Sequence, residues 1–193
     1  MDNTVGSLTQ FQKSVVIGSI LGDGYLRIIP KRKNAFLEIN HSYGAKEYVN
    51  WKYEILKNFC ISPPKKRKGN GNRIAYRFFT KQHPEFTKLH KEFYKGNRKN
   101  IPSSLELNPT ILSIWFMDDG SRCSNSDFYL NTQKFSLTEQ INLTEKLRNL
   151  GLQTTINKDK SYYRLRFLVS SIAKLKGMLK PNLIFSMRYK IGL

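Results

Sequence analysis

The sequence predicts an α+β fold in which the order helix, two strands, helix, two strands, helix (αββαββα) occurs twice in tandem, with pseudo-twofold symmetry. Two observations lead to this prediction. An apolar run that ends in aspartate and glycine occurs at residues 15–24 and again at 111–120, and strand-rich, basic hairpins follow each run. Helical patterns fill the remaining segments. The duplication predicts two halves, 1–96 and 109–193, joined by a linker at 97–108.

Both apolar runs are predicted to be buried helices, because apolar residues occur on nearly every side of each. Gly24 and Gly120 follow the aspartates and suit a helix C-cap, where a left-handed residue is needed. Each helix therefore ends in a carboxylate, Asp23 in the first half and Asp119 in the second. That end of a helix is already negative, so a nearby cation would be stabilising.

A metal site follows if the two helices pack side by side. Gly18 and Gly22 are four residues apart on one face and would let the backbones approach closely. Asp23 and Asp119 would then lie within a few ångströms, and paired carboxylates form an oxygen-ligand site that suits Mg²⁺. The alternative is that each Asp-Gly pair is only a turn after a core helix.

Four basic hairpins and four further helices complete the two halves. Turn residues separate the strands, and apolar stripes such as Tyr48, Trp51, Ile55 and Leu56 predict helices that cover one face of each sheet. The hairpins are expected at 25–29 with 35–41, at 65–68 with 73–79 across a turn at 69–72, at 120–130, and at 154–168 with a turn at 157–160. The helices are expected at 46–59, 84–94, 138–150 and 170–179.

Composition indicates a nucleic-acid partner. The 193 residues include 33 Lys and Arg against 14 Asp and Glu, a net charge of +19, and 39% hydrophobic residues suffice for a core. Cys60 and Cys123 lack the spacing of a disulfide framework or zinc site. No apolar run approaches the ~18 residues of a membrane span and residues 1–12 do not resemble a signal peptide, so no membrane association is expected.

Alternation in the hairpins predicts how DNA is contacted. Tyr163, Leu165 and Phe167 alternate with Arg164 and Arg166, so one face packs and the other presents guanidinium groups. A β-ribbon of this kind fits the major groove of DNA, although a merely solvated basic surface is the alternative. The predicted DNA-binding residues are Arg27, Lys31, Arg32, Lys33, Lys66, Lys68, Arg73, Arg77, Arg122, Lys158, Arg164 and Arg166.

These residues resemble the LAGLIDADG homing endonucleases in their single-chain, two-motif form, and most closely the intron-encoded mitochondrial subgroup. The motifs that carry the resemblance are LGDGY at 21–25 and WFMDDG at 115–120, with shorter shared words SPP at 62–64, IP at 101–102, LNTQ at 130–133 and MRYK at 187–190. The resemblance implies two saddle-shaped antiparallel sheets along the major groove and a central interface of the two motif helices.

The resemblance also implies a divalent-metal active site. It assigns the metal to Asp23 and Asp119, with Mg²⁺ expected, Mn²⁺ able to substitute, and two or three ions shared between them. Asp118 aligns with Gly22, so both are expected to contribute a backbone carbonyl or a more distant contact to the metal site.

Further active-site roles also come from the resemblance. Lys99 and Lys190 match basic positions near the scissile phosphates, and Gln133 matches a polar position beside the active site, with Ser42 as its apparent counterpart. His83 and His90 are expected to be structural, while His41 is left open between the active site and DNA contact.

The implied function is a metal-dependent double-strand break in a long, asymmetric DNA target, with short 3′ overhangs, that promotes intron mobility. An intron RNA maturase and an inactive DNA-binding protein are alternatives on the same fold, and a basic RNA-binding protein is a different one. A monomer is expected because one chain carries both motifs. An organellar origin is expected from the Lys-, Asn- and Ile-rich composition, with a bacterial cytoplasm as the alternative.

Overall fold

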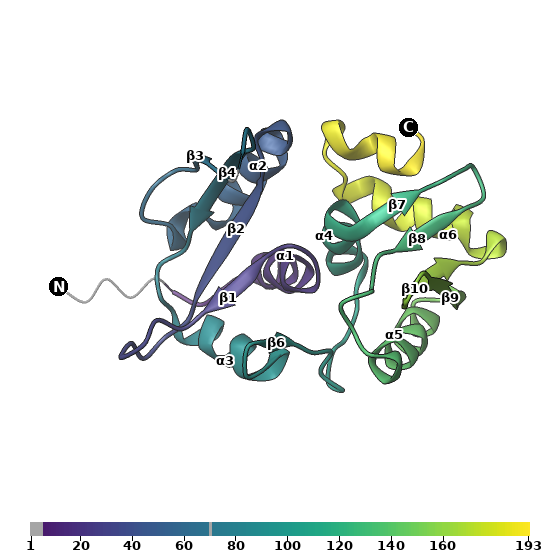
Figure 1. The fold of residues 1–193 in the computed structure, drawn as a ribbon, viewed down its shortest axis with the longest axis horizontal. Helices are drawn as coiled ribbons and strands as arrows, with labels where there is room; N and C mark the ends of the chain where they lie inside the picture. Colours follow the sequence, from purple (N-terminus) through teal and green to yellow (C-terminus); the bar gives the residue numbers. More distant parts are fainter. Residues whose placement is uncertain (1–5, 70) are drawn as a thin grey trace. The chain divides into compact units, whose positions relative to one another are not determined.

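The chain folds as two units that repeat the same order of elements. The structure, a computed structural model, describes residues 6–69 and 71–193. It divides into compact units Met1–Glu92 and Phe93–Leu193, and the order αββαββα occurs in both halves of the chain (Figure 1). The predicted α+β class with antiparallel sheets is confirmed. Among the described residues, no helix is both long and apolar enough to cross a bilayer.

The first half builds a four-stranded antiparallel sheet in the order β1-β2-β4-β3. Helix α2 packs on β2 and β4, and α1 contacts β1 and α2. The elements are α1 (Gln10–Leu21), β1 (Tyr25–Arg27), β2 (Phe36–Ser42), α2 (Lys46–Leu56), β3 (Lys65–Lys68), β4 (Ile74–Phe79) and α3 (Pro84–Phe93), with 3-10 turns at Tyr43–Ala45 and Lys57–Phe59.

The second half repeats this sheet in the order β7-β8-β10-β9. Two short strands precede it and two 3-10 segments follow it. The elements are β5 (Tyr94–Lys95), β6 (Arg98–Lys99), α4 (Pro109–Asp119), β7 (Gly120–Arg122), β8 (Phe128–Leu130), α5 (Leu137–Asn149), β9 (Thr154–Asp159), β10 (Tyr162–Phe167), α6 (Val169–Leu179), and the 3-10 segments Lys180–Asn182 and Phe185–Ile191.

Local sequence explains where the helices begin. Thr9 forms a capping box with Gln12 at α1, and Ser136 forms one with Glu139 at α5. Asn108 accepts a hydrogen bond from the Ile111 N–H at the start of α4. Each cap satisfies backbone donors that lack a partner within the helix.

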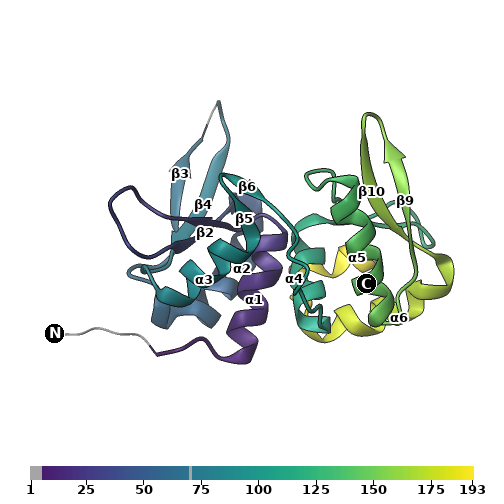
Figure 2. The same ribbon diagram turned by 90° about the horizontal axis from the view of Figure 1, so that it is seen from below.

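Two long hairpins extend past the helices of their own units, β3–β4 in the first and β9–β10 in the second (Figure 2). Along β10, Leu165 and Phe167 are fully buried, whereas Arg164 and Arg166 are half-buried. Tyr163 was expected on the packed face but is 39% exposed, and it lies in the second residue pair from the hairpin turn, opposite Lys158.

The β9–β10 turn was predicted three residues too early. Asn157, Lys158 and Asp159 are paired with β10, and the turn is formed by Lys160 and Ser161, with Lys160 at φ 56°. Polar residues favour a turn, but cross-strand pairing determined the register here. In the β3–β4 turn expected at 69–72, Asn70 lies outside the described residues, and the Gly69 N–H donates to the Arg73 carbonyl at 2.8 Å.

The glycines after the two aspartates were assigned the wrong conformation. Neither Gly24 nor Gly120 has a positive φ. Glycine is required for another reason, because a Cβ on Gly24 would lie 2.8 Å from the Ser19 carbonyl oxygen, and one on Gly120 would overlap the carbonyl and ring of Phe116. The strand that follows each helix folds back over its last turn and leaves no room for a side chain.

The segment predicted as a linker, 97–108, is attached to the second half. Glu139 on α5 accepts hydrogen bonds from Arg98 (2.8 Å) and the Ile101 N–H (3.1 Å). Lys146 Nζ donates to the carbonyls of Ser103 and Leu105, both at 2.7 Å. Residues 97–108 include strand β6, and these hydrogen bonds attach the segment to α5.

Candidate functional site

Asp119, the last residue of α4, already has a cationic partner. Lys134 Nζ lies 2.9 Å from Asp119 Oδ2, and the two side chains are 35% and 16% exposed. The carboxylate adds negative charge where the helix dipole is already negative, so a cation is stabilising at this position. The residue types therefore fit a divalent metal, since the site already attracts a cation and offers carboxylate oxygen.

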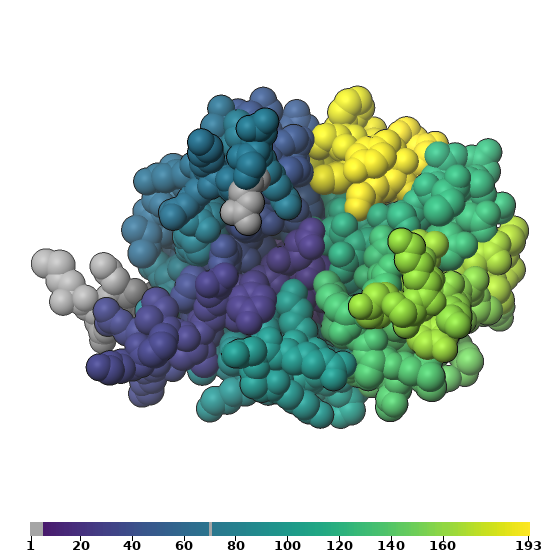
Figure 3. All heavy atoms as spheres, viewed as in Figure 1, coloured from purple at the N-terminus to yellow at the C-terminus, as the bar shows by residue number. Residues whose placement is uncertain are grey.

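Lys190 lies at the same end of α4. Its Nζ donates to the carbonyls of Phe116 (3.4 Å), Asp118 (3.1 Å) and Gly120 (3.0 Å). These include carbonyls that the helix leaves without an intrahelical partner. The structure thus places Lys190 beside Asp118 and Asp119, and Asp118 contacts Lys190 through its backbone carbonyl. Lys190 belongs to the C-terminal segment at the surface of the second half (Figure 3, yellow).

Gln133 lies on loop 131–136, which also carries Lys134. The loop begins with a hydrogen bond from the Asn131 N–H to the Asp119 carbonyl at 3.0 Å. Gln133 Nε2 donates to Asp159 Oδ2 at 2.9 Å. The loop that carries Gln133 therefore starts at the C-terminal end of α4, but the Gln133 side chain is bonded to Asp159 at the end of β9.

A buried amide anchors this loop. Gln140 on α5 is 1% exposed. Its Nε2 lies 3.3, 3.1 and 3.0 Å from the carbonyls of Thr132, Phe135 and Tyr163, and its Oε1 accepts from the Thr132 hydroxyl at 2.9 Å. Gln140 consequently links loop 131–136 to β10.

In the first half, Asp23 follows α1 and lies beside His41. His41 Nδ1 is 3.5 Å from Asp23 Oδ2, with the histidine side chain 10% exposed and the aspartate 51% exposed. The His41 ring also packs against Tyr48, with centroids 5.3 Å apart. Sequence reasoning left the role of His41 open, and the structure places it next to the candidate metal ligand. Gly22 ends α1, and its N–H donates to the Gly18 carbonyl at 3.1 Å.

The remaining residues considered in the sequence for active-site roles are Ser42, Lys99, His83 and His90. Ser42 is exposed at the end of β2, and Lys99 is half-buried on β6, opposite Tyr94. His83 packs against Phe59, and its Nδ1 accepts a hydrogen bond from the Glu85 N–H at the start of α3. For His90, within α3, burial lowers the pKa.

Four of the predicted DNA-binding arginines are paired with acidic residues. Arg27 lies 2.9 Å and Arg77 lies 3.6 Å from the carboxylate of Glu38, whose side chain is only 8% exposed. Arg166 pairs with Asp127, and this hydrogen bond lowers the pKa of Asp127. The fourth pair is Arg164 with Asp159, at 3.8 Å.

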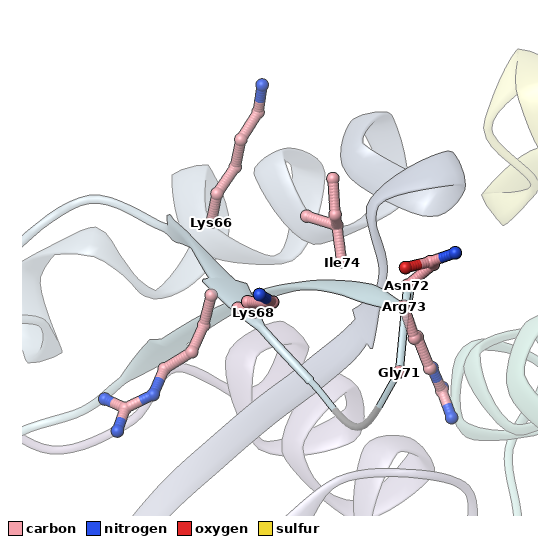
Figure 4. A pocket seen from close by; sticks show the side chains of 7 residues that line it. Lys66, Lys68, Gly71, Asn72, Arg73 and Ile74 are labelled. Atoms are coloured by element: carbon pink, nitrogen blue, oxygen red, sulfur yellow. The ribbon is translucent and has the colours of Figure 1, made fainter.

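The remaining predicted cations are more accessible. Around the β3–β4 turn, Lys66, Lys68 and Arg73 line a pocket of about 410 Å³, and the side chains of Lys66 and Arg73 extend in different directions (Figure 4). Arg122 donates a hydrogen bond to Asn125. Within the described part of the chain, eight predicted cations are exposed and have no acidic partner: Lys31, Arg32, Lys33, Lys66, Lys68, Arg73, Arg122 and Lys158.

Sequence reasoning missed Lys134 and Glu38. Lys134 follows Gln133 directly, and that position was the only available clue. Glu38 lies on β2 and pairs with arginines from β1 and β4. These ion pairs could be recognised only once the order of the strands in the sheet was known.

Comparison with known proteins agrees with this architecture. A model of the LAGLIDADG DNA endonuclease family matches residues 13–175. A cytochrome b mRNA maturase bI2 of Saccharomyces cerevisiae is 30% identical over 211 residues, covering 100% of this chain and 50% of the relative. A probable intron-encoded endonuclease 1 of Wickerhamomyces canadensis is 30% identical, covering 96% of this chain and 85% of the relative.

Solved structures show the same fold. The homing endonuclease I-WcaI bound to its DNA recognition sequence superposes with a TM-score of 0.89 at 27% identity, covering 97% of this chain and 88% of that one. I-DmoI in complex with DNA and Mn has a TM-score of 0.60 at 14% identity, covering 90% and 98%, which supports the fold alone. Two tandem αββαββα units that each carry an acidic motif at the end of the first helix define a two-motif endonuclease scaffold. The chain belongs to the LAGLIDADG DNA endonuclease family.

Proposed function

We propose that this chain is a site-specific, metal-dependent endonuclease that cuts both strands of a long, asymmetric DNA target and leaves short 3′ overhangs. The observation that carries the proposal is an aspartate at the C-terminal end of the first helix in both halves, Asp23 two residues past α1 and Asp119 as the last residue of α4. At Asp119 the carboxylate already holds a cation. The chain spans half the length of the maturase relative, so the activity of that relative is not carried over to this chain except as a proposal.

In this proposal Asp23 and Asp119 hold Mg²⁺, or Mn²⁺ in its place, with two or three ions shared between them. When bound, the metal would lower the pKa of a water molecule and stabilise negative charge on the departing 3′ oxygen. Lys99 and Lys190 would stabilise charge on the scissile phosphates, and Gln133 would orient the attacking water. Lys190 is supported by its position at the end of α4, where its Nζ donates to the carbonyls of Asp118 and Gly120, the two residues that flank Asp119 in the chain.

The exposed cations would bind the DNA backbone and bases. Cations without an acidic partner can approach phosphates at little cost, whereas the paired arginines are already oriented by carboxylates. We therefore assign phosphate contacts first to the exposed set around β3–β4, and base contacts to Arg27, Arg77, Arg164 and Arg166. The I-WcaI complex with its DNA recognition sequence supports double-stranded DNA as the partner.

The proposal is tested by cleavage of a randomised duplex library in the presence of Mg²⁺, followed by sequencing of the ends. One long site with a short 3′ overhang is the expected result. Binding should weaken with salt, by a log–log slope of about −0.9 for each phosphate contacted. A preparation that binds duplex DNA but cuts no member of the library would contradict the proposed activity.

A second candidate function is an intron RNA maturase. The observation that favours it is the cytochrome b mRNA maturase bI2 that matches the whole of this chain. Competition between the host intron RNA and the intron-free duplex would separate the two functions. Preference for the RNA, with splicing enhanced by the protein, would favour the maturase.

We also propose that the protein acts as a monomer in an organelle. One chain carries both aspartates, so no second copy is needed to complete the site. The Lys-, Asn- and Ile-rich composition and the similarity to a cytochrome b mRNA maturase support the organellar origin. Size measurement by light scattering and localisation by a fluorescent fusion would test these two points.

A further inference from the structure

The ion pair between Lys134 and Asp119 is held in place by the backbone around it. The two residues are 15 positions apart and come from a loop and a helix end. The Asn131 N–H bonds to the Asp119 carbonyl at 3.0 Å, so the loop that carries Lys134 is anchored to the same residue that the lysine neutralises. The ammonium group also lies over the Phe135 ring, 5.6 Å from its centroid.

The anchoring extends into the core. Buried Gln140 bonds to both Thr132 and Phe135, which flank Gln133 and Lys134. The backbone of the loop is therefore held on both sides of Lys134, whereas the lysine side chain is partly exposed, at 35%. A flexible four-carbon side chain on a fixed backbone suits a group that exchanges between two positions.

We propose that Lys134 is the resident counter-ion of Asp119 in the metal-free protein and that a divalent cation binds this carboxylate by displacing the ammonium group. The inference rests on the proposed function, in which Asp119 holds the metal. Mg²⁺ bonds oxygen directly at about 2.0–2.1 Å, so a metal on Asp119 and an ammonium 2.9 Å from Oδ2 would be like charges separated by a few ångströms. Such charges repel strongly in a partly buried site.

Before the metal arrives, Lys134 supplies the positive charge that stabilises the Asp119 carboxylate at the negative end of α4. Its displacement leaves the ammonium beside the site after the metal binds, because the loop backbone does not move. The displaced lysine then presents three N–H donors close to where the scissile phosphate would bind. Lys134 thus acts on the metal through Asp119, as a positioning residue.

The experiment measures Mn²⁺ binding to the intact chain by the electron paramagnetic resonance signal of free Mn²⁺, at constant ionic strength and without DNA. The variants are Lys134→Met, Lys134→Arg and Asp119→Asn, with Lys158→Met as a matched loss of one exposed positive charge in the same half. Because the pair is partly exposed, its loss is expected to tighten Mn²⁺ binding by about two- to fivefold. Lys134→Arg should bind Mn²⁺ as the wild type does, because it retains the ion pair.

Tighter binding in Lys134→Met alone, together with loss of the site in Asp119→Asn, would support the inference. Unchanged or weaker binding in Lys134→Met, with the site still lost in Asp119→Asn, would overturn it and leave the proposed function intact. Equal tightening in Lys158→Met would also overturn it, since general charge would then be the cause. Mn²⁺ binding that Asp119→Asn does not affect would contradict the metal assignment itself, and the inference with it.

Discussion

Replacing Gln140 with leucine should strongly destabilise the second half. The amide has two N–H donors shared among three nearby carbonyls, and its oxygen accepts one further bond, so about three hydrogen bonds are lost. At about 0.5–1.5 kcal/mol for each, and with buried acceptors left without a partner, the free energy of unfolding should fall by about 2–4 kcal/mol.

The chain offers a convenient probe for this measurement. Trp115 on α4 is fully buried in the second half, and the other tryptophan, Trp51, lies in the first half. In a Trp51→Phe background, urea unfolding followed by fluorescence therefore reports on the second half. Asn149→Leu, an exposed amide on the same helix, is the matched control and should change the free energy by less than about 0.5 kcal/mol. A Gln140→Leu effect below about 1 kcal/mol, or no larger than that of the control, would refute the anchoring role.

Three other predictions concern single residues. Gly120→Ala should lower the free energy of unfolding by about 1–3 kcal/mol, because the added Cβ overlaps the last turn of α4. Gly177→Ala, in open space within α6, should raise the free energy of unfolding by about 0.5–1 kcal/mol. Urea titrations of both variants test these opposite signs. Burial raises the pKa of the Cys60 thiol to about 12, so in the native protein at pH 8 iodoacetamide should label exposed Cys123 and leave Cys60 unmodified, as mass spectrometry would reveal. Burial alone would raise the pKa of Glu139, but hydrogen bonds from Ser136 and from the Ile101 N–H, together with the Arg98 charge, lower it. The stabilisation that the ionised Glu139 provides should therefore be present above the ordinary carboxyl pKa and be lost as pH falls through the lowered pKa. The difference in free energy of unfolding between wild type and Glu139→Gln, measured by urea unfolding from pH 7 to pH 3, should narrow toward low pH.

The order of the elements could be predicted because each has a local cause. The capping boxes at Thr9 and Ser136 fix where two helices start, and alternation along β10 separates buried from accessible positions. The predicted turn at 157–160 failed because pairing between β9 and β10 outweighed the local preference of its polar residues. Pairing of this kind involves partners distant in the chain and is weakly encoded in any short segment.

The same distinction separates what was found in the site from what was missed. The positions of Asp23 and Asp119 at the ends of two helices were predictable because the motif is repeated at the end of each apolar run. Lys134 was not, because its distance to Asp119 depends on how the loop after β8 returns to the end of α4. Likewise, sequence alone could not sort the basic residues, since pairing of Arg27 and Arg77 with Glu38 depends on three neighbouring strands.

The most direct test of the central claim compares the wild type with Asp23→Asn and Asp119→Asn on a duplex that contains the selected target. Binding is measured with Ca²⁺ by fluorescence anisotropy, and cleavage of each strand is measured with Mg²⁺ on a sequencing gel. The account predicts that all three proteins bind the duplex and that only the wild type cuts both strands. Full double-strand cleavage by either aspartate variant would contradict the assignment of these two carboxylates as the metal ligands.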